Sequence, residues 1–236
     1  MRTKRVEIEC EHCSILENSL FGELCLESQK EISQHKSCTV YKKSQVVFRE
    51  GTRPLGVFCI NSGKIKVYKT GAEGKNQIIQ VLKAGDIMGY RAMLSEDQYP
   101  VSAETLEEST LCFIPKSDFL QVLNQDAVFT QTIIKLMSKE LSAMAESITT
   151  LAQKPVRERL AGALLMLKDT YGIDGHDNGP VEINLTREDL ANIVGTATET
   201  LIRLLHDFKE DKLIETQGRK IKVLEPQKLV RIANLY

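Results

Sequence analysis

The chain has 236 residues, of which 42% are hydrophobic and 27% charged, a balance that is ordinary for a globular protein with one large or two modest cores. Its 31 basic and 32 acidic side chains give a net charge of −1, which argues against a protein whose whole surface is basic and binds nucleic acid for that reason. Any DNA contact must therefore depend on local charge. No apolar run approaches the roughly 20 residues that span a bilayer, and the N-terminus lacks the apolar core of a signal peptide. We therefore expect a cytoplasmic protein without a membrane partner.

The N-terminal segment is rich in cysteine. In a cytoplasmic chain, cysteines are more typical of metal ligands, redox groups or free thiols than of a disulfide framework. The first two cysteines lie in a polar tail, which is expected to be a disordered lead-in unless its thiols bind something. Short helices are expected at 20–24 and 27–34. Four of the six cysteines lie within the first 38 residues: Cys10, Cys13, Cys25 and Cys38.

Between Thr39 and Pro115 the pattern changes to short β-rich runs separated by glycine turns. Evenly spaced strands of this kind are typical of a closed or sandwich-like antiparallel barrel. A short helix is expected to follow at 116–123. The predicted strands are 46–48, 56–60, 64–68, 77–82 and 111–114.

The segment 127–152 contains no Pro or Gly and predicts one long helix. Its apolar residues step by four and three, which is the spacing of a heptad seam. We expect this single stripe to be shared between the barrel and a second copy of the chain. The predicted dimerisation residues are Ile134, Met137, Leu141, Met144, Ile148 and Leu151.

A second domain is expected after Pro155, which breaks the long helix and places a hinge near residues 153–155. A helix is predicted at 156–171, a polar loop at 172–180 and a short strand at 181–185.

Two short helices joined by a tight turn come next. Thr186 is a good N-cap, followed by acidic residues in the first turn and an apolar stripe. Gly195 stands where a helix is usually ended by a residue free to take positive φ. A second apolar run then follows, with apolar positions Leu201, Leu204, Leu205 and Phe208. This pattern predicts a helix-turn-helix.

The first turn of the second helix offers side chains to the major groove of DNA. Glu199 is suited to accept a hydrogen bond from a cytosine amino group, and Arg203, one turn on, to donate to a guanine or a phosphate. The alternative is a solvated ion pair on the helix face, worth about 0.3–0.5 kcal/mol. The four predicted reading residues are Thr198, Glu199, Ile202 and Arg203.

A hairpin with a basic tip is predicted over residues 213–223. Its cations Arg219, Lys220 and Lys222 are suited to contact phosphates, which position a DNA-binding protein without choosing the sequence.

With these features the chain resembles Crp/Fnr-type transcription regulators over nearly its whole length. The reading helix of that family carries an E-x-x-x-R pattern, which Glu199 and Arg203 match; Thr198 and Ile202 differ from the residues of the two best-known branches, so a known half-site cannot be copied across. The resemblance implies an α+β fold with an antiparallel, cyclic-nucleotide-binding-like β-barrel of jelly-roll type, a long dimerisation helix and a winged helix-turn-helix. The implied domains are a cysteine-bearing segment at 1–38, the barrel at 39–125, the dimerisation helix at 126–153 and the DNA-binding domain at 154–236.

Cyclic nucleotide is the first effector that the resemblance suggests, but the residues that bind it in the family are missing. Tyr90 follows Gly89 where the family pattern has a Glu, and the stretch 99–101 holds no Arg for the phosphate. Met144 and Ala145 stand where the cyclic-AMP branch has its adenine-binding pair. Because a buried phosphate without a cation is very costly, we expect no cyclic-nucleotide binding.

An iron–sulfur cluster is the second candidate that the resemblance implies, because the oxygen-sensing branch holds one with four thiolates. The matching metal set is Cys10, Cys13, Cys25 and Cys112, although the spacing from Cys13 to Cys25 is about twice that of the branch, and Cys38 could replace Cys25. Zinc or a redox pair at Cys10 and Cys13 are alternatives. Cys59 is interpreted as a small apolar residue on a buried strand.

The leading hypothesis is a homodimeric, sequence-specific transcription regulator that binds double-stranded DNA at palindromic promoter sites, with RNA polymerase as a candidate partner. One alternative is a cyclic-nucleotide-binding regulatory module that acts on a partner protein, but such a module needs no reading helix. The other is a dithiol oxidoreductase built on Cys10 and Cys13, which would require a strand before the motif and a helix that starts at it. We expect no enzymatic activity.

Overall fold

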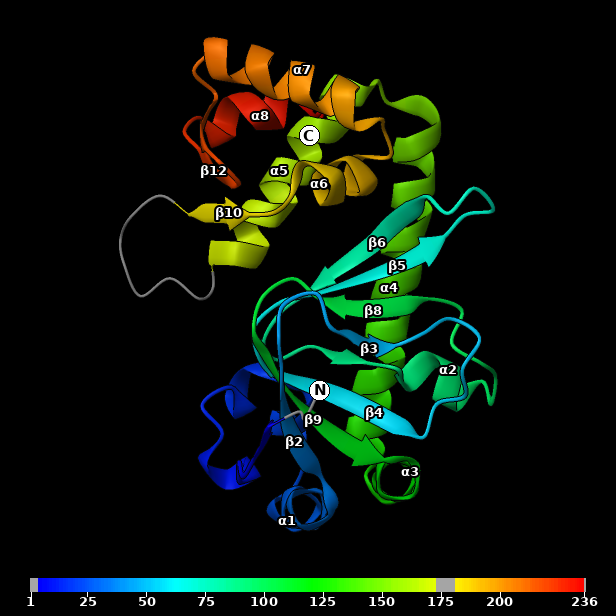
Figure 1. Cartoon of the computed structure of the whole chain (residues 1–236). Coiled ribbons are helices and arrows are strands. Elements are labelled where there is room, and N and C mark those ends of the chain that lie inside the picture. The colour runs from blue at the N-terminus through cyan, green and yellow to red at the C-terminus, as the bar shows by residue number, and fades with distance from the viewer. Residues whose placement is uncertain (1–3, 173–180, 236) are drawn as a thin grey trace. The chain divides into compact units, whose positions relative to one another are not determined.

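The computed structural model describes residues 4–172 and 181–235 (Figure 1). Most of the predicted polar loop, from Ile173 to Pro180, lies outside the described residues. The chain divides by contacts into two compact units, Met1–Thr70 with Gln80–Leu141 and Gly71–Ile79 with Ser142–Tyr236. In the described part of the chain, no helix has the length and apolarity needed to cross a membrane.

The first unit is built on two sheets, and the predicted antiparallel barrel is confirmed (Figure 1). In sheet order, the five-stranded sheet consists of β1 (Lys4–Val6), β2 (Ser37–Tyr41), β9 (Ser109–Pro115), β4 (Gly56–Ser62) and β7 (Ile87–Met88). The four-stranded sheet consists of β3 (Val46–Phe48), β8 (Ser102–Thr105), β5 (Ile65–Thr70) and β6 (Asn76–Leu82). The runs of β-branched residues predicted five of these strands; the others are too short or too polar to stand out.

Two hydrophobic clusters hold this unit together. The first contains inward-facing residues of both sheets, among them Ile60, Val67 and Leu111. The second fills the space between the five-stranded sheet and its helices, because alternate strand residues such as Val57 and Ile114 point to that side. These helices are η1 (Cys10–His12), η2 (Leu16–Asn18), η3 (Leu20–Glu23), α1 (Leu26–His35), α2 (Tyr90–Leu94), α3 (Lys116–Gln125) and α4 (Ala127–Gln153).

The N-terminal segment is part of this fold, so the expectation of a disordered polar tail was wrong. β1 pairs antiparallel with β2, and the Cys10 backbone N–H donates to Ser33 Oγ at 3.0 Å. The sequence concealed this arrangement because the burial is carried by isolated residues, Cys10, Phe21 and Leu24, rather than by an apolar run.

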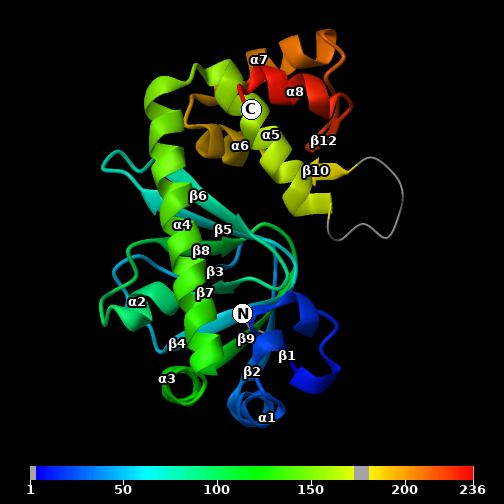
Figure 2. The ribbon, with the colours of Figure 1, turned by 180° about the vertical axis from the view of Figure 1, so that it is seen from behind.

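The long helix α4, which runs along the first unit in Figure 2, has two separate apolar stripes rather than the one shared stripe that was expected. Phe129 and Ile133 pack in the second cluster with partly buried Leu136 beside them. The predicted dimerisation residues form a different stripe, one residue further around the helix than the buried stripe of Phe129 and Ile133. Ile133 is 2% exposed, whereas Ile134 is 57% exposed. Met144 of the seam is partly buried, and its remaining members are exposed: Ile134, Met137, Leu141, Ile148 and Leu151.

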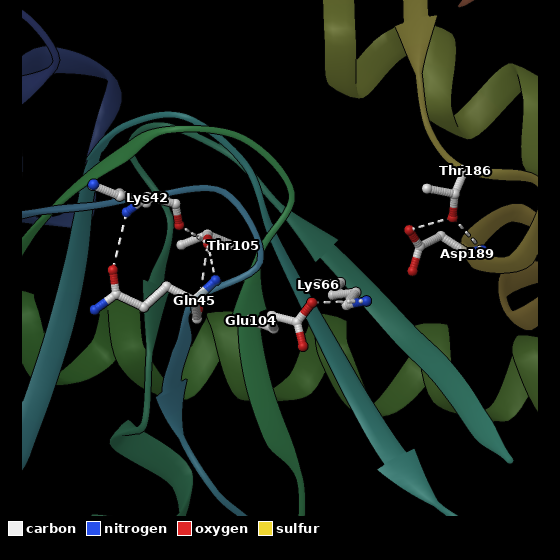
Figure 3. A network of polar contacts seen from close by, with 7 residues as sticks. All are labelled: Lys42, Gln45, Lys66, Glu104, Thr105, Thr186 and Asp189. Atoms are coloured by element: carbon white, nitrogen blue, oxygen red, sulfur yellow. Dashed lines mark hydrogen bonds and ion pairs between the residues drawn. The ribbon is translucent and has the colours of Figure 1, made fainter. Parts of the chain in front are cut away.

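Polar groups inside the barrel wall are satisfied locally. The buried Thr105 hydroxyl donates to the Lys42 carbonyl at 2.6 Å and accepts from the Gln45 backbone N–H at 2.9 Å (Figure 3). Lys66 and Glu104 form an ion pair at 3.1 Å across neighbouring strands (Figure 3). These contacts fix the turn between β2 and β3 and the register of β5 against β8.

The second unit contains the predicted helix-turn-helix and hairpin. Its core is formed by fully buried residues of four elements, among them Leu164, Leu190, Leu201 and Ile221. The helices are α5 (Val156–Gly172), α6 (Arg187–Val194), α7 (Thr198–Glu210) and α8 (Pro226–Ile232), and the strands, in sheet order, are β10 (Glu182–Asn184), β12 (Lys220–Val223) and β11 (Ile214–Gln217).

The packing of α1 gives a direct test of the folded N-terminal segment. Ile32 is 1% exposed and Leu26, on the same helix, is 70% exposed. Ile32→Ala is expected to lower the free energy of unfolding by about 2–5 kcal/mol, because it removes buried methyl groups and leaves a cavity. Leu26→Ala is the matched control and is expected to stay within about 0.5 kcal/mol of wild type. Urea denaturation measures both, and equal effects would show that α1 does not pack as described.

Candidate nucleic-acid interface and ligand sites

The helix-turn-helix is fixed locally at both ends of α6. Thr186 Oγ1 accepts from the Asp189 backbone N–H at 2.9 Å and donates to the Asp189 carboxylate at 2.6 Å (Figure 3). Gly195 ends the helix with φ +71°, a left-handed conformation that favours glycine. The predicted N-cap and turn glycine are therefore both confirmed.

The helix α7 presents its polar face to solvent because its apolar face is buried. Leu201, Leu205 and Phe208 lie in the core of the second unit. Among the predicted reading residues, Glu199, Ile202 and Arg203 are exposed, and Thr198 at the start of the helix is partly exposed. These side chains lie within the first two turns and form one exposed surface, which we call the reading surface.

Glu199 and Arg203 do not pair with each other in the structure. In the described parts of the chain, neither side chain forms an ion pair or hydrogen bond. The alternative interpretation, a solvated ion pair on the helix face, is therefore not observed. Both groups are available to an external partner.

The basic side chains of the hairpin formed by β11 and β12 differ in whether they form ion pairs. Lys220 Nζ lies 2.6 Å and Lys222 Nζ 3.1 Å from the carboxylate of Glu182 on β10, and hydrogen bonds from the two lysines lower the pKa of Glu182. Arg219 at the tip is exposed, and it has no such partner among residues 4–172 and 181–235. Arg219 is thus the hairpin cation with an uncompensated charge.

A basic side chain that sequence reasoning missed ties the hairpin to α6. Arg187 Nη2, at the first residue of α6, donates to the Gly218 carbonyl at 2.9 Å in the hairpin turn. Burial lowers the pKa of Arg187. This hydrogen bond spans 31 residues of sequence, so no local pattern indicated it.

Arg159 on α5 was also missed, although it makes the most extensive polar contacts near the turn. Its Nε donates to the Val194 carbonyl at 3.0 Å and its Nη2 to the Gly195 carbonyl at 3.1 Å. Its Nη1 donates to the carbonyls of Leu151 at 3.2 Å and Lys154 at 3.1 Å. One guanidinium therefore caps the C-terminal ends of both α4 and α6, where unpaired carbonyls accumulate.

The barrel contains a pocket beside α2, which we call the barrel pocket. Its lining residues indicate which kinds of ligand the barrel could bind. Phe48 and Tyr99 stack there with ring centroids 4.0 Å apart. Tyr90 donates its hydroxyl to Glu140 on α4 at 2.6 Å, and Arg91 Nε lies 3.5 Å from the same carboxylate. Burial and the bond to Glu140 raise the pKa of Tyr90.

A second pocket gathers thiols, and we call it the thiol pocket. It is lined by Cys10 and Cys13 from the N-terminal segment and by Cys59 and Cys112 from β4 and β9. Burial raises the pKa of the Cys59 thiol to about 12. Cys59 was interpreted from sequence as a small apolar strand residue, and its place in this pocket was not foreseen.

The predicted metal set is only partly brought together. Cys10, Cys13 and Cys112 line the thiol pocket, whereas Cys25 is exposed at the start of α1, with its Sγ 3.2 Å from Ser28 Oγ. Cys112 is joined to Cys38 by a disulfide. In this form of the described chain, no three His, Cys, Asp or Glu side chains are placed to hold a metal ion.

The contacts of Arg159 predict a positioning role. Arg159→Lys keeps the charge but loses the planar set of donors, so it cannot bond the carbonyls of both helices. We expect a loss of about 1–3 kcal/mol in stability and weaker binding to all DNA sequences, because the turn before α7 is no longer held. The exposed Arg231 provides the control, Arg231→Lys. Thermal unfolding and fluorescence anisotropy with duplex DNA measure the two effects; wild-type behaviour of Arg159→Lys in both would contradict the role.

Two parts of the chain match known protein families. Residues 38–126 match the cyclic nucleotide-binding domain and residues 158–232 the Crp-like helix-turn-helix domain. The fumarate and nitrate reduction regulatory protein of Vibrio cholerae is 30% identical over 231 residues, covering 97% of this chain and 91% of the relative. The transcriptional activator protein Anr of Pseudomonas protegens is 26% identical, covering 96% and 93%. The crystal structure of TTHA1359, a CRP/FNR family regulator from Thermus thermophilus, superposes with a TM-score of 0.67 at 21% identity, covering 84% and 98%. The chain belongs to the Crp/Fnr family of DNA-binding transcription regulators.

Proposed function

We propose that this regulator binds palindromic DNA as a homodimer in the cytoplasm, with the reading surface in the major groove of each half-site. The observation that carries the proposal is that Glu199, Ile202 and Arg203 are exposed on a helix whose other face is locked in the core. A helix held in this way enters the groove with its first turn facing base edges.

The chemistry of the reading surface suggests what it reads. A carboxylate accepts from the amino group of cytosine, and a guanidinium donates two hydrogen bonds to guanine. Glu199 and Arg203 are separated by one turn and have no competing partner among the residues that the structure describes, so the pair is suited to a G·C step. Arg219 at the hairpin tip is suited to a phosphate, which adds affinity but no sequence preference.

Dimerisation through α4 is supported by its exposed apolar seam. Leu141 and Ile148 are 70% and 68% exposed, at positions two turns apart on one face. An apolar stripe of this length is costly to leave in water, and a second copy of the same helix provides a complementary face. Two reading helices related by two-fold symmetry would then require half-sites about 34–36 Å apart. RNA polymerase remains a candidate partner of the bound dimer.

The barrel pocket does not suit a cyclic nucleotide. Arg91, the arginine that lines it, is already paired with Glu140, and a phosphate placed there would face that carboxylate. The stacked pair of Phe48 and Tyr99 offers no cation. We infer that this chain responds to another signal, and the name of the Vibrio cholerae relative, which refers to fumarate and nitrate reduction, favours one linked to that reduction. A regulatory module without DNA binding is disfavoured by the intact helix-turn-helix.

Sequence discrimination tests the role of the reading surface. Arg203→Ala is expected to relax the preference at one base pair by about 1–3 kcal/mol, because the two donors to guanine are removed. Arg219→Ala is expected to weaken binding to all sequences alike and to reduce the salt slope of the affinity by about one. Competition binding with duplexes selected from a random library measures both, and sequence preferences unchanged by Arg203→Ala would contradict the reading geometry.

Substitutions in the exposed seam of α4 test the proposed dimer. Leu141→Glu or Ile148→Glu places a carboxylate in the seam, where burial without a partner is unfavourable, and should yield monomers. Lys139→Glu is a matched control, because residue 139 lies on the exposed face of α4 away from the heptad positions. Sedimentation velocity distinguishes the species. Dimers of both seam variants with wild-type affinity would move the interface elsewhere.

A further inference from the structure

The three-stranded sheet of the second unit has one buried face and one exposed face. Ile183 on β10 and Ile221 on β12 are directly opposite each other and fully buried. Because successive side chains of a strand point to opposite faces, Lys220 and Lys222 both lie on the exposed face. Glu182 is directly opposite Lys222 and therefore lies on that face as well. We call this surface of two lysines and one glutamate the hairpin face.

Glu182 binds both lysines of the hairpin face at once. Its Oε2 lies 2.6 Å from Lys220 Nζ and its Oε1 lies 3.1 Å from Lys222 Nζ, so each carboxylate oxygen has its own ammonium partner. The two lysines lower the pKa of Glu182, so the carboxylate is charged at neutral pH. Two ammonium groups and one carboxylate leave one positive charge on the hairpin face instead of two.

A second acidic residue shows that this pairing is selective. Glu215 on β11 is directly opposite Lys222, on the side away from β10. Its side chain is exposed, and it forms no ion pair in the portion of the chain that the structure describes. Lys222 therefore stands between two carboxylates and binds the one on β10. Glu215 provides a reference residue of the same charge on the same sheet.

The position of the hairpin does not depend on the carboxylate of Glu182. The backbone of β12 pairs with both β10 and β11, and Ile221 anchors it in the core. Arg187 Nη2 donates to the Gly218 carbonyl at 2.9 Å and so holds the turn. Exposed ion pairs contribute little to stability. Loss of the charge of Glu182 would therefore free two ammonium groups and leave the hairpin in place.

We propose that Glu182 competes with DNA phosphates for Lys220 and Lys222, and so sets the sequence-independent part of the affinity for DNA. Carboxylate and phosphate oxygens are both anionic acceptors for an ammonium group. A phosphate that takes a lysine must displace Glu182, and the displaced carboxylate stays nearby and repels the phosphate. Because phosphate contacts carry no sequence information, the competition weakens binding to all sequences alike. This inference rests on the proposed function, since the hairpin must lie against the DNA backbone.

The first experiment measures binding of the full-length protein to two duplexes, one selected from a random library and one of unrelated sequence, by fluorescence anisotropy between about 50 and 200 mM salt. Glu182→Gln is expected to raise the affinity for both duplexes by the same factor and to steepen the salt slope by about one, because one more positive charge meets the phosphates. Glu215→Gln is the matched control and is expected to change the slope much less. Wild-type affinity and slope in Glu182→Gln, or an equal effect of Glu215→Gln, would overturn the inference.

A double-mutant cycle separates competition for the lysines from simple repulsion between Glu182 and DNA. In a background that carries Lys220→Gln and Lys222→Gln there is no ammonium group to release. Glu182→Gln is expected to have only a small effect in that background, similar to that of Glu215→Gln in wild type. An effect as large as in wild type would show repulsion alone and overturn the competition. Thermal unfolding checks that each variant keeps the fold.

The outcomes also distinguish this inference from the proposed reading geometry. Arg203→Ala, measured on the same duplexes, tests the reading surface alone. A changed sequence preference in Arg203→Ala together with a wild-type salt slope in Glu182→Gln would overturn the competition and leave the reading geometry standing. A steeper slope in Glu182→Gln without any sequence preference in wild type would support the competition and contradict the reading geometry.

Discussion

The DNA-binding unit depends on one guanidinium. Without Arg159, the last carbonyls of α4 and α6 would be left at helix ends where their dipoles converge, which is unfavourable for both the helices and the turn between α6 and α7. The same side chain joins the end of the long helix, at Leu151, to the turn at Gly195. The C-terminal end of α4 is therefore connected to the turn that precedes α7 through the hydrogen bonds of one side chain.

The long helix serves two surfaces because its apolar residues form two parallel stripes. Phe129 and Ile133 anchor it to the first unit, and the exposed seam begins at the very next residue, Ile134. If one stripe served both purposes, dimer formation would have to compete with barrel packing. Because the stripes are separate, the exposed one stays accessible while the helix is attached to its own barrel.

Sequence patterns predicted those features whose contacts lie within a few residues along the chain, such as the two ends of α6. Thr186 caps α6 by accepting a hydrogen bond from the backbone N–H of Asp189, three residues on, and Gly195 needs only its own backbone conformation, so both could be recognised in the sequence. Arg159 and Cys59 could not, because their surroundings come from distant parts of the chain. Arg159 donates to the Val194 carbonyl, 35 residues away, and Cys59 shares the thiol pocket with Cys10 and Cys13 of the N-terminal segment. The folded N-terminal segment was missed for the same reason: its buried residues are scattered, and their partner is a sheet that follows later in the chain.

The thiol pocket is packed against the same hydrophobic cluster as the long helix. Cys10 belongs to the same hydrophobic cluster as Phe21 and Ile32, and that cluster includes Phe129 and Ile133 of α4. Phe21 and Phe129 are in direct contact, with ring centroids 5.7 Å apart. Close-packed side chains transmit displacement rather than absorb it. The packing between η1 and the barrel-facing stripe of α4 is therefore continuous, and the exposed apolar stripe lies beside it on the same helix.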